Sequence, residues 1–474
     1  GSPERLAKHI RTQGWEPADA RLTVSDVPAI VEMLGGKKLY GDNPTVALRE
    51  LIQNACDAIR ARRILERRLP EWGEVRIRFR ETDEGTWLEV ADNGIGMGRR
   101  ILTGPLLNFG QSFWRSSMMT DEFPGLSAGG MRATGQFGIG FFSVFMLGNR
   151  VTVTSRRYDA AASDALTLEF GAGVAGRPLV RRAHPAERPN DGGSVVRVLL
   201  TIPPEQQGGL LHATFLEDWR PEALIAYLAP AVDATLIFES DVKSEICVRA
   251  GDWKTISDQS LLSRMAWSGG SESEIGRMRA LVDADGRIHG RAFIDQNSSG
   301  AILVGGLRAA PIKCFGGILS GKPVTAARDR ASLTAPSDVL ARWATEQAEL
   351  IQSHEEGLSQ IVHAFGGNTR RLPVALVCGA YLDADGFRRH ILTLNEIYVV
   401  LPFFLHEKTI LRSDIIVPNV RELPDLFPQS AWDDLVVSIV KDAWGGFQRE
   451  VREECIGTVD DCEIVRPVIH YTRT

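Results

Sequence analysis

The stretch ELIQNACDA carries three polar side chains whose spacing would let them act together. At about 100° per residue, Glu50, Asn54 and Asp57 fall within about 60° of one another on a helix. Ile52 and Ile59 fall on the opposite side, as in an ordinary core-facing stripe. Taken alone, the stretch is typical of a solvated polar face, so any chemistry depends on what the rest of the chain brings to it.

Three further stretches have the residue types that bind a flat or anionic ligand. In ADNGIGM (91–97), Asp92 precedes two glycines, which let the backbone approach a ligand while the carboxylate accepts a hydrogen bond from an amino group. In GQFGIGFFS (135–143), three glycines precede an apolar run, so the backbone N–H groups are placed to form an anion nest at a helix N-terminus. GGSVVRV (192–198) opens a strand with Ser194. Each stretch is weak evidence alone, because glycine turns are common.

In this order and spacing, the four stretches resemble the N, G1 and G2 boxes of the gyrase, heat-shock protein 90, histidine kinase and MutL (GHKL) ATPase superfamily. The wording ELIQNACDA, DNGIGM, NFGQSF and GQFGIGFFS is specifically similar to heat-shock protein 90. The resemblance covers roughly residues 40–200 and weakens beyond them. It implies that the polar helix stripe faces a nucleotide, with ATP and Mg²⁺ as cofactors.

The resemblance also implies a role for each matching residue. Glu50 matches the general base that activates the attacking water, and Asn54 matches the ligand of the magnesium ion that bridges the phosphates. Asp57 matches an acid that helps hold the nucleotide end of the helix, and Asp92 matches the acceptor for the adenine amino group. The other matching positions are Gly96 and Met97 in the wall of the base pocket, Asn108 at the ribose or phosphate, Gly135, Gln136, Phe137, Gly138, Ile139, Gly140 and Phe141 in the loop around the phosphates, and Ser194 near the base.

Two segments depart from the family pattern. Just after NFGQSF the pattern calls for a lysine, whereas this chain has Trp114 followed by Arg115, which puts the phosphate contact there in doubt. The segment RSSMMTDEFPGLSAGGMRAT would be the movable lid, and its sequence is not the usual one.

A second phosphate-binding pattern, GGILSGKP (316–323), is disfavoured because Pro323 has no hydroxyl group for magnesium. We interpret it as a turn leading into VTAARDRASL, which is similar to the middle-domain loop of heat-shock protein 90, where an arginine reaches the γ-phosphate. Arg328, followed by an acid as in the family, is the candidate and Arg330 the second. A surface ion pair is the alternative for either arginine.

The elements that must position these residues can be predicted from hydrophobic period and breakers. We expect a helix from Asn43–Pro44 to Pro70, with strands and helices after it. The basic run RARRILERR within that helix is interpreted as a solvated surface. The expected strands cover 74–80, 86–92, 150–157, 194–202, 234–240, 287–294, 301–307 and 395–405, and later helices cover 337–357 and 432–444.

We therefore predict an α/β fold (an α+β sandwich) in three parts. An ATP-binding domain of the Bergerat type is expected in residues 1–210, and a middle domain similar to ribosomal protein S5 in 211–370. A C-terminal α/β portion is expected in 371–474.

Composition excludes several other classes of protein. The 474 residues carry a net charge of -6 and a pI of about 5.9, which argues against a general nucleic-acid binder. Six scattered cysteines without a CxxC pair, and nine histidines without HExxH, give no zinc pattern and favour reduced thiols in the cytoplasm. The sequence contains no run of 18 apolar residues, so it predicts no membrane-spanning helix. The chain begins GSPERL without methionine, so we expect its natural N-terminus to lie upstream.

The expected function is that of an ATP-dependent chaperone, which binds and hydrolyses ATP with lid closure and domain docking. The expected partners are ATP, ADP and client or partner proteins. The sequence leaves open whether the chain forms a homodimer. Three alternatives remain. A sacsin-like or specialised bacterial nucleotide switch would bind ATP without chaperone activity. A MutL- or gyrase-like DNA machine is disfavoured by the acidic charge, and a histidine kinase by the lack of any histidine except His9 before the boxes.

Overall fold

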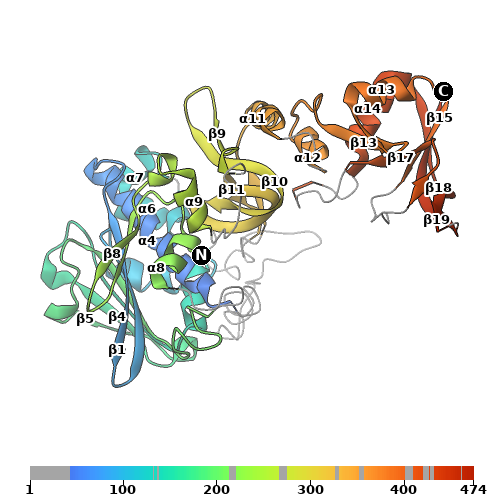
Figure 1. The fold of residues 1–474 in the computed structure, drawn as a ribbon. Helices are drawn as coiled ribbons and strands as arrows, with labels where there is room; N and C mark the ends of the chain where they lie inside the picture. The colour runs from blue at the N-terminus through green and yellow to red at the C-terminus, as the bar shows by residue number, and fades with distance from the viewer. Residues whose placement is uncertain are drawn as a thin grey trace, which may run out of the picture.

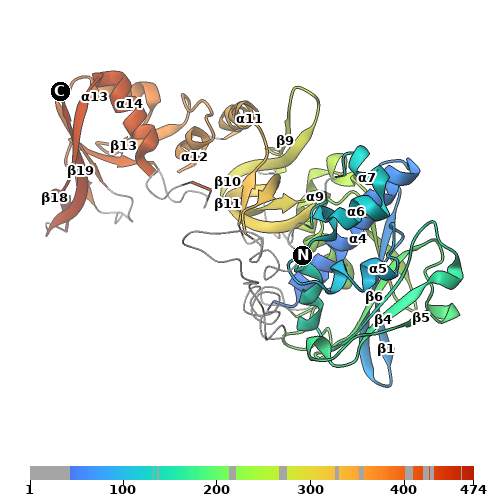
Figure 2. The same cartoon turned by 180° about the vertical axis from the view of Figure 1, so that it is seen from behind.

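The computed structural model describes eleven stretches of the chain, and its secondary structure forms three units in a row (Figures 1 and 2). The described residues are 43–131, 133–135, 138–212, 220–265, 275–325, 330–351, 357–400, 409–419, 426–427, 432–460 and 462–474. Mixed helices and sheets confirm the predicted α/β fold class. None of the described helices is long and apolar enough to cross a membrane.

The first unit is an eight-stranded sheet, with strand order β5-β4-β3-β6-β2-β1-β7-β8, covered by helix α4. Its strands are β1 (Glu74–Thr82), β2 (Gly85–Asp92), β3 (Arg150–Arg156), β4 (Leu166–Phe170), β5 (Leu179–Arg182), β6 (Gly193–Leu199), β7 (Thr235–Glu239) and β8 (Ser244–Val248). Its helices of four residues or more, apart from 3-10 turns, are α4 (Thr45–Glu66), α5 (Arg99–Leu102), α6 (Ser117–Glu122), α7 (Pro124–Ala128) and α8 (Pro221–Leu228). The core lies between α4 and the sheet. Helix α9 (Asp258–Arg264) packs Leu261 and Leu262 against side chains of the second sheet.

Helix α4 begins and ends where the local chemistry favours it. The Asn43 side-chain oxygen accepts hydrogen bonds from the backbone N–H and the hydroxyl of Thr45, at 3.1 and 2.7 Å. Arg67 ends the helix in the left-handed conformation. The apolar stripe through Leu48, Ile52 and Ile59 is fully buried against the sheet. The opposite stripe, which carries Glu50, Asn54 and Asp57, is therefore turned toward the loops between the strands.

The first sheet continues past residue 210, where we expected the first domain to end. Strand β7 pairs in parallel with β1, from Glu74 opposite Thr235 to Arg78 opposite Glu239. Helix α8 and strands β7 and β8 also supply apolar side chains to the core of the first unit. The division at residues 210 and 370 stays a prediction, but the first sheet includes residues up to Val248.

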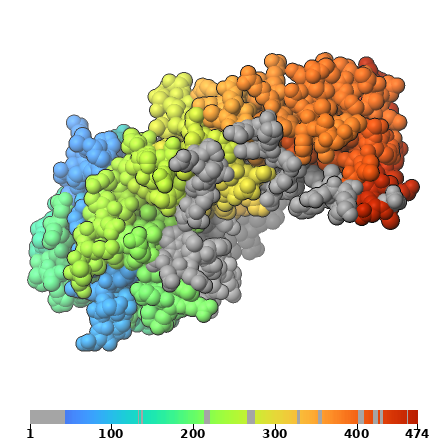
Figure 3. All heavy atoms as spheres, viewed as in Figure 1, coloured from blue at the N-terminus to red at the C-terminus, as the bar shows by residue number. Residues whose placement is uncertain are grey.

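The second and third units each have their own sheet and core. The second unit has the sheet order β12-β11-β10-β9, with β9 (Arg279–Val282), β10 (Ile288–Val304), β11 (Leu307–Pro323), β12 (Ala331–Leu333), and helices α11 (Ser337–Leu350) and α12 (Leu358–Ala364). The third has the order β14-β13-β17-β15-β19-β18-β16, with β13 (Pro373–Val377), β14 (Ala380–Asp383), β15 (Glu396–Val400), β16 (Ile410–Leu411), β17 (Ile415–Pro418), β18 (Phe447–Val459), β19 (Cys462–Arg473), and helices α13 (Ala384–Ile391) and α14 (Asp434–Trp444). The second unit packs directly on the first, and the third lies at the far end (Figure 3).

Candidate functional site

Residues from all four sequence stretches line one cavity between α4, the loops that follow β2 and α7, and the beginning of β6. The expected residues in its wall are Glu50, Asn54, Asp92, Gly96, Met97, Gly135, Gly138, Ile139, Gly140, Phe141 and Ser194. Gln136 and Phe137 lie outside the described residues. The cavity therefore gathers side chains that are more than 140 positions apart in the sequence, from Glu50 to Ser194.

The carboxylate of Glu50 lies at the loop end of the cavity. Glu50 is 2% exposed, and its Oε1 is 3.2 Å from Nη2 of Arg49. A Cβ atom added to Gly140 would fall 2.4 Å from Glu50 Oε2, so the loop backbone at residue 140 lies directly against this carboxylate. Since Glu50 and Asp57 are both buried, the interpretation of this stripe as a solvated polar face is wrong.

Asp57 does not line the cavity but anchors the loop that does. Its carboxylate accepts hydrogen bonds from the backbone N–H groups of Thr134, at 3.0 Å, and Gly135, at 2.8 Å. Arg60 Nη1 donates to the same carboxylate at 2.7 Å. Burial raises the pKa of Asp57, while the Arg60 charge and the two N–H groups lower it. Asp57 therefore fixes the point where the glycine loop begins.

The opposite end of the cavity is formed where β2 ends beside β6. Asp92 pairs with Ser194 in the sheet register, and Asp92 Oδ1 accepts a hydrogen bond from the Gly94 N–H at 2.8 Å. Burial raises the pKa of Asp92 to about 7, although the N–H groups of Gly94 and Ser194 lower it. Gly96 has φ +63°, and an added Cβ would fall 1.9 Å from the carbonyl oxygen of Arg156. This tight turn therefore requires glycine.

Ser155 on β3 is a residue of this end that we did not predict. Its hydroxyl accepts a hydrogen bond from the Met97 N–H at 2.8 Å and lies 2.9 Å from the Ser194 hydroxyl. The same hydroxyl donates a hydrogen bond to the Gly193 carbonyl oxygen at 3.1 Å. Ser155 thus ties the turn at Gly96 and Met97 to the beginning of β6. The only signal for it in the sequence is its place in the strand pattern TVTSRR.

Two expected contacts are not brought to the cavity. Asn108 is exposed, and its amide donates to the side chain of Gln111, which does line the cavity. Arg115 is exposed and outside the wall, whereas Trp114 lines it, beside Phe113 at a ring-centroid distance of 5.1 Å. The position where the resemblance calls for lysine therefore presents an aromatic ring.

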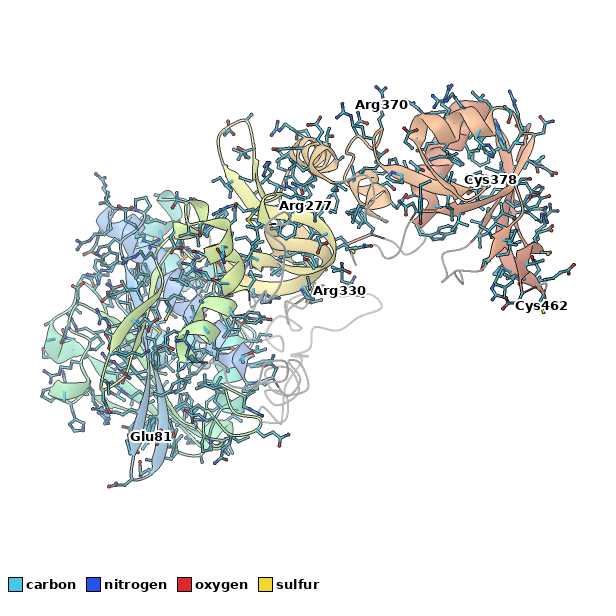
Figure 4. All side chains as sticks on the ribbon, viewed as in Figure 1. Glu81, Arg277, Arg330, Arg370, Cys378 and Cys462 are labelled. Atoms are coloured by element: carbon cyan, nitrogen blue, oxygen red, sulfur yellow. The ribbon has the colours of Figure 1, made fainter. Side chains whose placement is uncertain are left out.

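The arginine expected from the second unit cannot be placed, because Arg328 lies outside the described residues. Arg330 is exposed at the edge of the second unit, and its carbonyl oxygen accepts from the Val324 N–H at 3.0 Å (Figure 4).

The oxygen and N–H groups of the cavity fit a magnesium nucleotide. The Asn54 side-chain oxygen lies 3.7 Å from the position of a Cβ added to Gly135, so it faces the glycine loop. Among the described residues no group of three His, Cys, Asp or Glu side chains could hold a metal ion. Mg²⁺ is usually held by one or two protein oxygens together with substrate phosphates and water, and Asn54 could supply one such oxygen.

Comparison with known proteins agrees with this geometry. Residues 43–187 match the family described as histidine kinase-, DNA gyrase B-, and HSP90-like ATPase. The chaperone protein HtpG of Alkalilimnicola ehrlichii is 28% identical over 232 residues, which cover 46% of this chain and 33% of that protein. HtpG of Methylobacterium nodulans is 33% identical over 190 residues, covering 38% of this chain and 29% of that protein. HtpG of Rhodopseudomonas palustris is 37% identical over 132 residues, covering 27% and 21%.

The chain thus spans a third or less of the length of each of these relatives. The family match covers α4, β2 and the glycine loop, which form most of the cavity wall. Residues 43–187 therefore match the family of histidine kinase-, DNA gyrase B-, and HSP90-like ATPases, and the chain is similar to HtpG over less than half of its length.

Proposed function

We propose that this chain binds ATP with Mg²⁺ and hydrolyses it, and that hydrolysis is coupled to movement of the lid and docking of the second unit. The observation that supports this most is the single cavity, with an acid at the base end and a glycine loop at the other. Glu50 lies against that loop. Phosphoryl transfer needs little covalent chemistry from the protein, so positioning and electrostatics carry most of the effect.

Each end of the cavity has a distinct task in this proposal. Asp92 accepts a hydrogen bond from the adenine amino group, while Ser155 and Ser194 hold the turn beside it. At the other end, Asn54 supplies an oxygen to Mg²⁺, which offsets the charge of the phosphates. Glu50 takes the proton of the attacking water, and the ion pair with Arg49 holds its carboxylate in place.

The relatives are HtpG chaperone proteins, which supports a chaperone role that we extend to this chain as part of the proposal. Client proteins, a cytoplasmic location and a homodimer belong to the same proposal.

Binding of ATP is tested by calorimetry on the full chain and on Asp92→Asn. Asparagine has one acceptor oxygen where aspartate has two, so either the adenine amino group or the Gly94 N–H loses its acceptor, and an unsatisfied buried donor costs about 1–3 kcal/mol. We expect affinity to fall at least about 10-fold. Asp164→Asn, at an exposed aspartate outside the cavity, is the matched control and should bind as the parent does. Equal affinity of Asp92→Asn and the parent would remove Asp92 from the base pocket.

A nucleotide switch without turnover is the second candidate. Trp114 favours it, because this cavity wall has an aromatic ring where the resemblance calls for a phosphate-binding lysine. Release of phosphate by the parent chain separates the two functions.

A further inference from the structure

The turn between β10 and β11, which belongs to the second sheet, is inserted into the first unit. Leu307 is 2% exposed and packs in the core beneath α4. The carbonyl oxygen of Gly306 accepts a hydrogen bond from the Ala231 N–H at 3.1 Å. A Cβ added to Gly306, at φ +88°, would fall 2.4 Å from the Ala231 carbonyl oxygen. The turn therefore fits here only because glycine has no side chain.

The same turn lies directly on the residue that begins the glycine loop of the cavity. A Cβ added to Gly305 would fall 2.5 Å from Thr134 Oγ1 and 2.8 Å from its methyl carbon. Thr134 immediately precedes Gly135, and both donate their N–H groups to Asp57. The second sheet thus contacts the first residue of the loop that surrounds the phosphates in our proposal.

Arg60 joins these two parts through its guanidinium group. On the loop side, Nη1 donates to Asp57 Oδ1 at 2.7 Å and to Thr134 Oγ1 at 3.0 Å. On the other side, Nε and Nη2 donate to the Asp233 carboxylate at 2.8 and 2.7 Å, and Nη2 donates to the Gly305 carbonyl oxygen at 3.1 Å. Burial disfavours the charge of Arg60, yet its bonds to Asp233 and the charges of Asp233 and Asp57 raise its pKa above the usual range.

We propose that Arg60 is a positioning residue for the phosphate loop, held in place by Asp233 and by the Gly305 turn of the second sheet. The inference rests on the proposed function and deepens it. Asp57 is buried and needs a cation to remain an ionised acceptor for two N–H groups. Because the guanidinium group is planar, fixing one edge on Asp233 and Gly305 fixes the edge that meets Asp57 and Thr134.

The consequence is a coupling between the terminal phosphate and the second sheet. A loop that is ordered by the turn binds a triphosphate better, and by linkage a bound triphosphate strengthens the contact with the turn by the same factor. A diphosphate makes fewer contacts with the loop and should be less sensitive to it.

The test compares the full-length parent with Asp233→Asn, Arg60→Lys and the control Arg181→Lys. Asp233→Asn keeps the shape of the side chain and removes its charge. Lysine at 60 cannot span both carboxylates and the carbonyl oxygen as the guanidinium does. Arg181 pairs with Glu169 and Glu187 at the opposite edge of the sheet.

Two readouts are measured for each variant. Hydrogen exchange without nucleotide follows the amides of Thr134 and Gly135. Calorimetry gives the affinities for MgADP and for a non-hydrolysable magnesium ATP analogue.

For Asp233→Asn and Arg60→Lys we expect exchange at Thr134 and Gly135 to rise about 10-fold, and analogue affinity to fall about 10-fold. ADP affinity should change less than about 3-fold, and Arg181→Lys should match the parent in every measurement. If Arg60 had a purely structural role, its variants would change the affinities for both nucleotides equally or change neither, and the Thr134 and Gly135 amides would exchange at the parental rate. That result would overturn the inference. A parent that binds neither nucleotide would refute the proposed function, while the exchange measurement would still decide whether Arg60 positions the loop.

Discussion

Adenine binding should weaken as the pH falls, and at low pH it should be accompanied by release of a proton from Asp92. In the empty cavity burial raises the pKa of Asp92 to about 7. The adenine amino group is a donor, so it favours the ionised carboxylate and lowers this pKa in the complex. The proton must therefore leave whenever adenine binds to a molecule whose Asp92 is protonated.

The size of the effect follows from that pKa. About half of the empty molecules carry the proton at pH 7 and about nine-tenths carry it at pH 6. Binding should thus release about half a proton at pH 7 and about 0.9 at pH 6. Affinity should fall about 5-fold between pH 7 and pH 6, and nearly 10-fold per pH unit below pH 6. Above about pH 8 both effects should vanish, because Asp92 is already ionised.

Calorimetry with adenosine, in pairs of buffers with different ionisation enthalpies, measures the released proton directly. Adenosine is the ligand of choice because it has no phosphate that titrates near pH 7. A binding enthalpy independent of the buffer between pH 6 and 7, together with a constant affinity, would refute the assignment of Asp92 to the adenine amino group.

Three further predictions concern other residues of the chain. Gln53 is fully buried, and in the described part of the chain the nitrogen and oxygen of its side-chain amide have no hydrogen-bond partner. Gln53→Leu should therefore raise the free energy of unfolding, measured by urea titration, by about 1–3 kcal/mol. An unchanged or lower free energy of unfolding would contradict this. Leu307→Ala should lower the free energy of unfolding by about 2–5 kcal/mol, and a loss below about 1 kcal/mol would mean that the turn is not firmly docked. Arg328→Ala should bind ATP normally but release phosphate on the order of 100-fold more slowly, whereas Arg330→Ala should behave as the parent; the reverse outcome would make Arg330 the arginine that reaches the γ-phosphate.

Local sequence was sufficient to predict the elements that carry the site. The helix from Asn43 appears as α4, and the strand before the Asp92 turn appears as β2, since both depend on hydrophobic period and on breakers nearby in the chain. The gathering of the glycine loop, Glu50 and Ser194 around one cavity was expected only from the resemblance.

Contacts between distant parts of the chain were not predictable in this way. The parallel pairing of β1 with β7 joins residues about 160 positions apart, whereas the boundary at 210 was placed from a local proline- and glycine-rich stretch. The basic run on α4 was interpreted as a solvated surface, and this was wrong. Arg62 is 2% exposed, and Arg60 and Arg63 pair with Asp233. These ion pairs with carboxylates from other elements offset the desolvation cost of burying the arginines.

The central claim is that Glu50 activates water for ATP hydrolysis in this cavity. Its most direct test is steady-state phosphate release at saturating MgATP by the full-length parent and Glu50→Ala, with ATP affinity measured on both. We predict turnover by the parent and a loss on the order of 100-fold or more in the variant, with nearly equal affinity, as expected when a general base is removed. Hydrolysis by Glu50→Ala at the parental rate, or no hydrolysis by the parent despite bound ATP, would contradict the account.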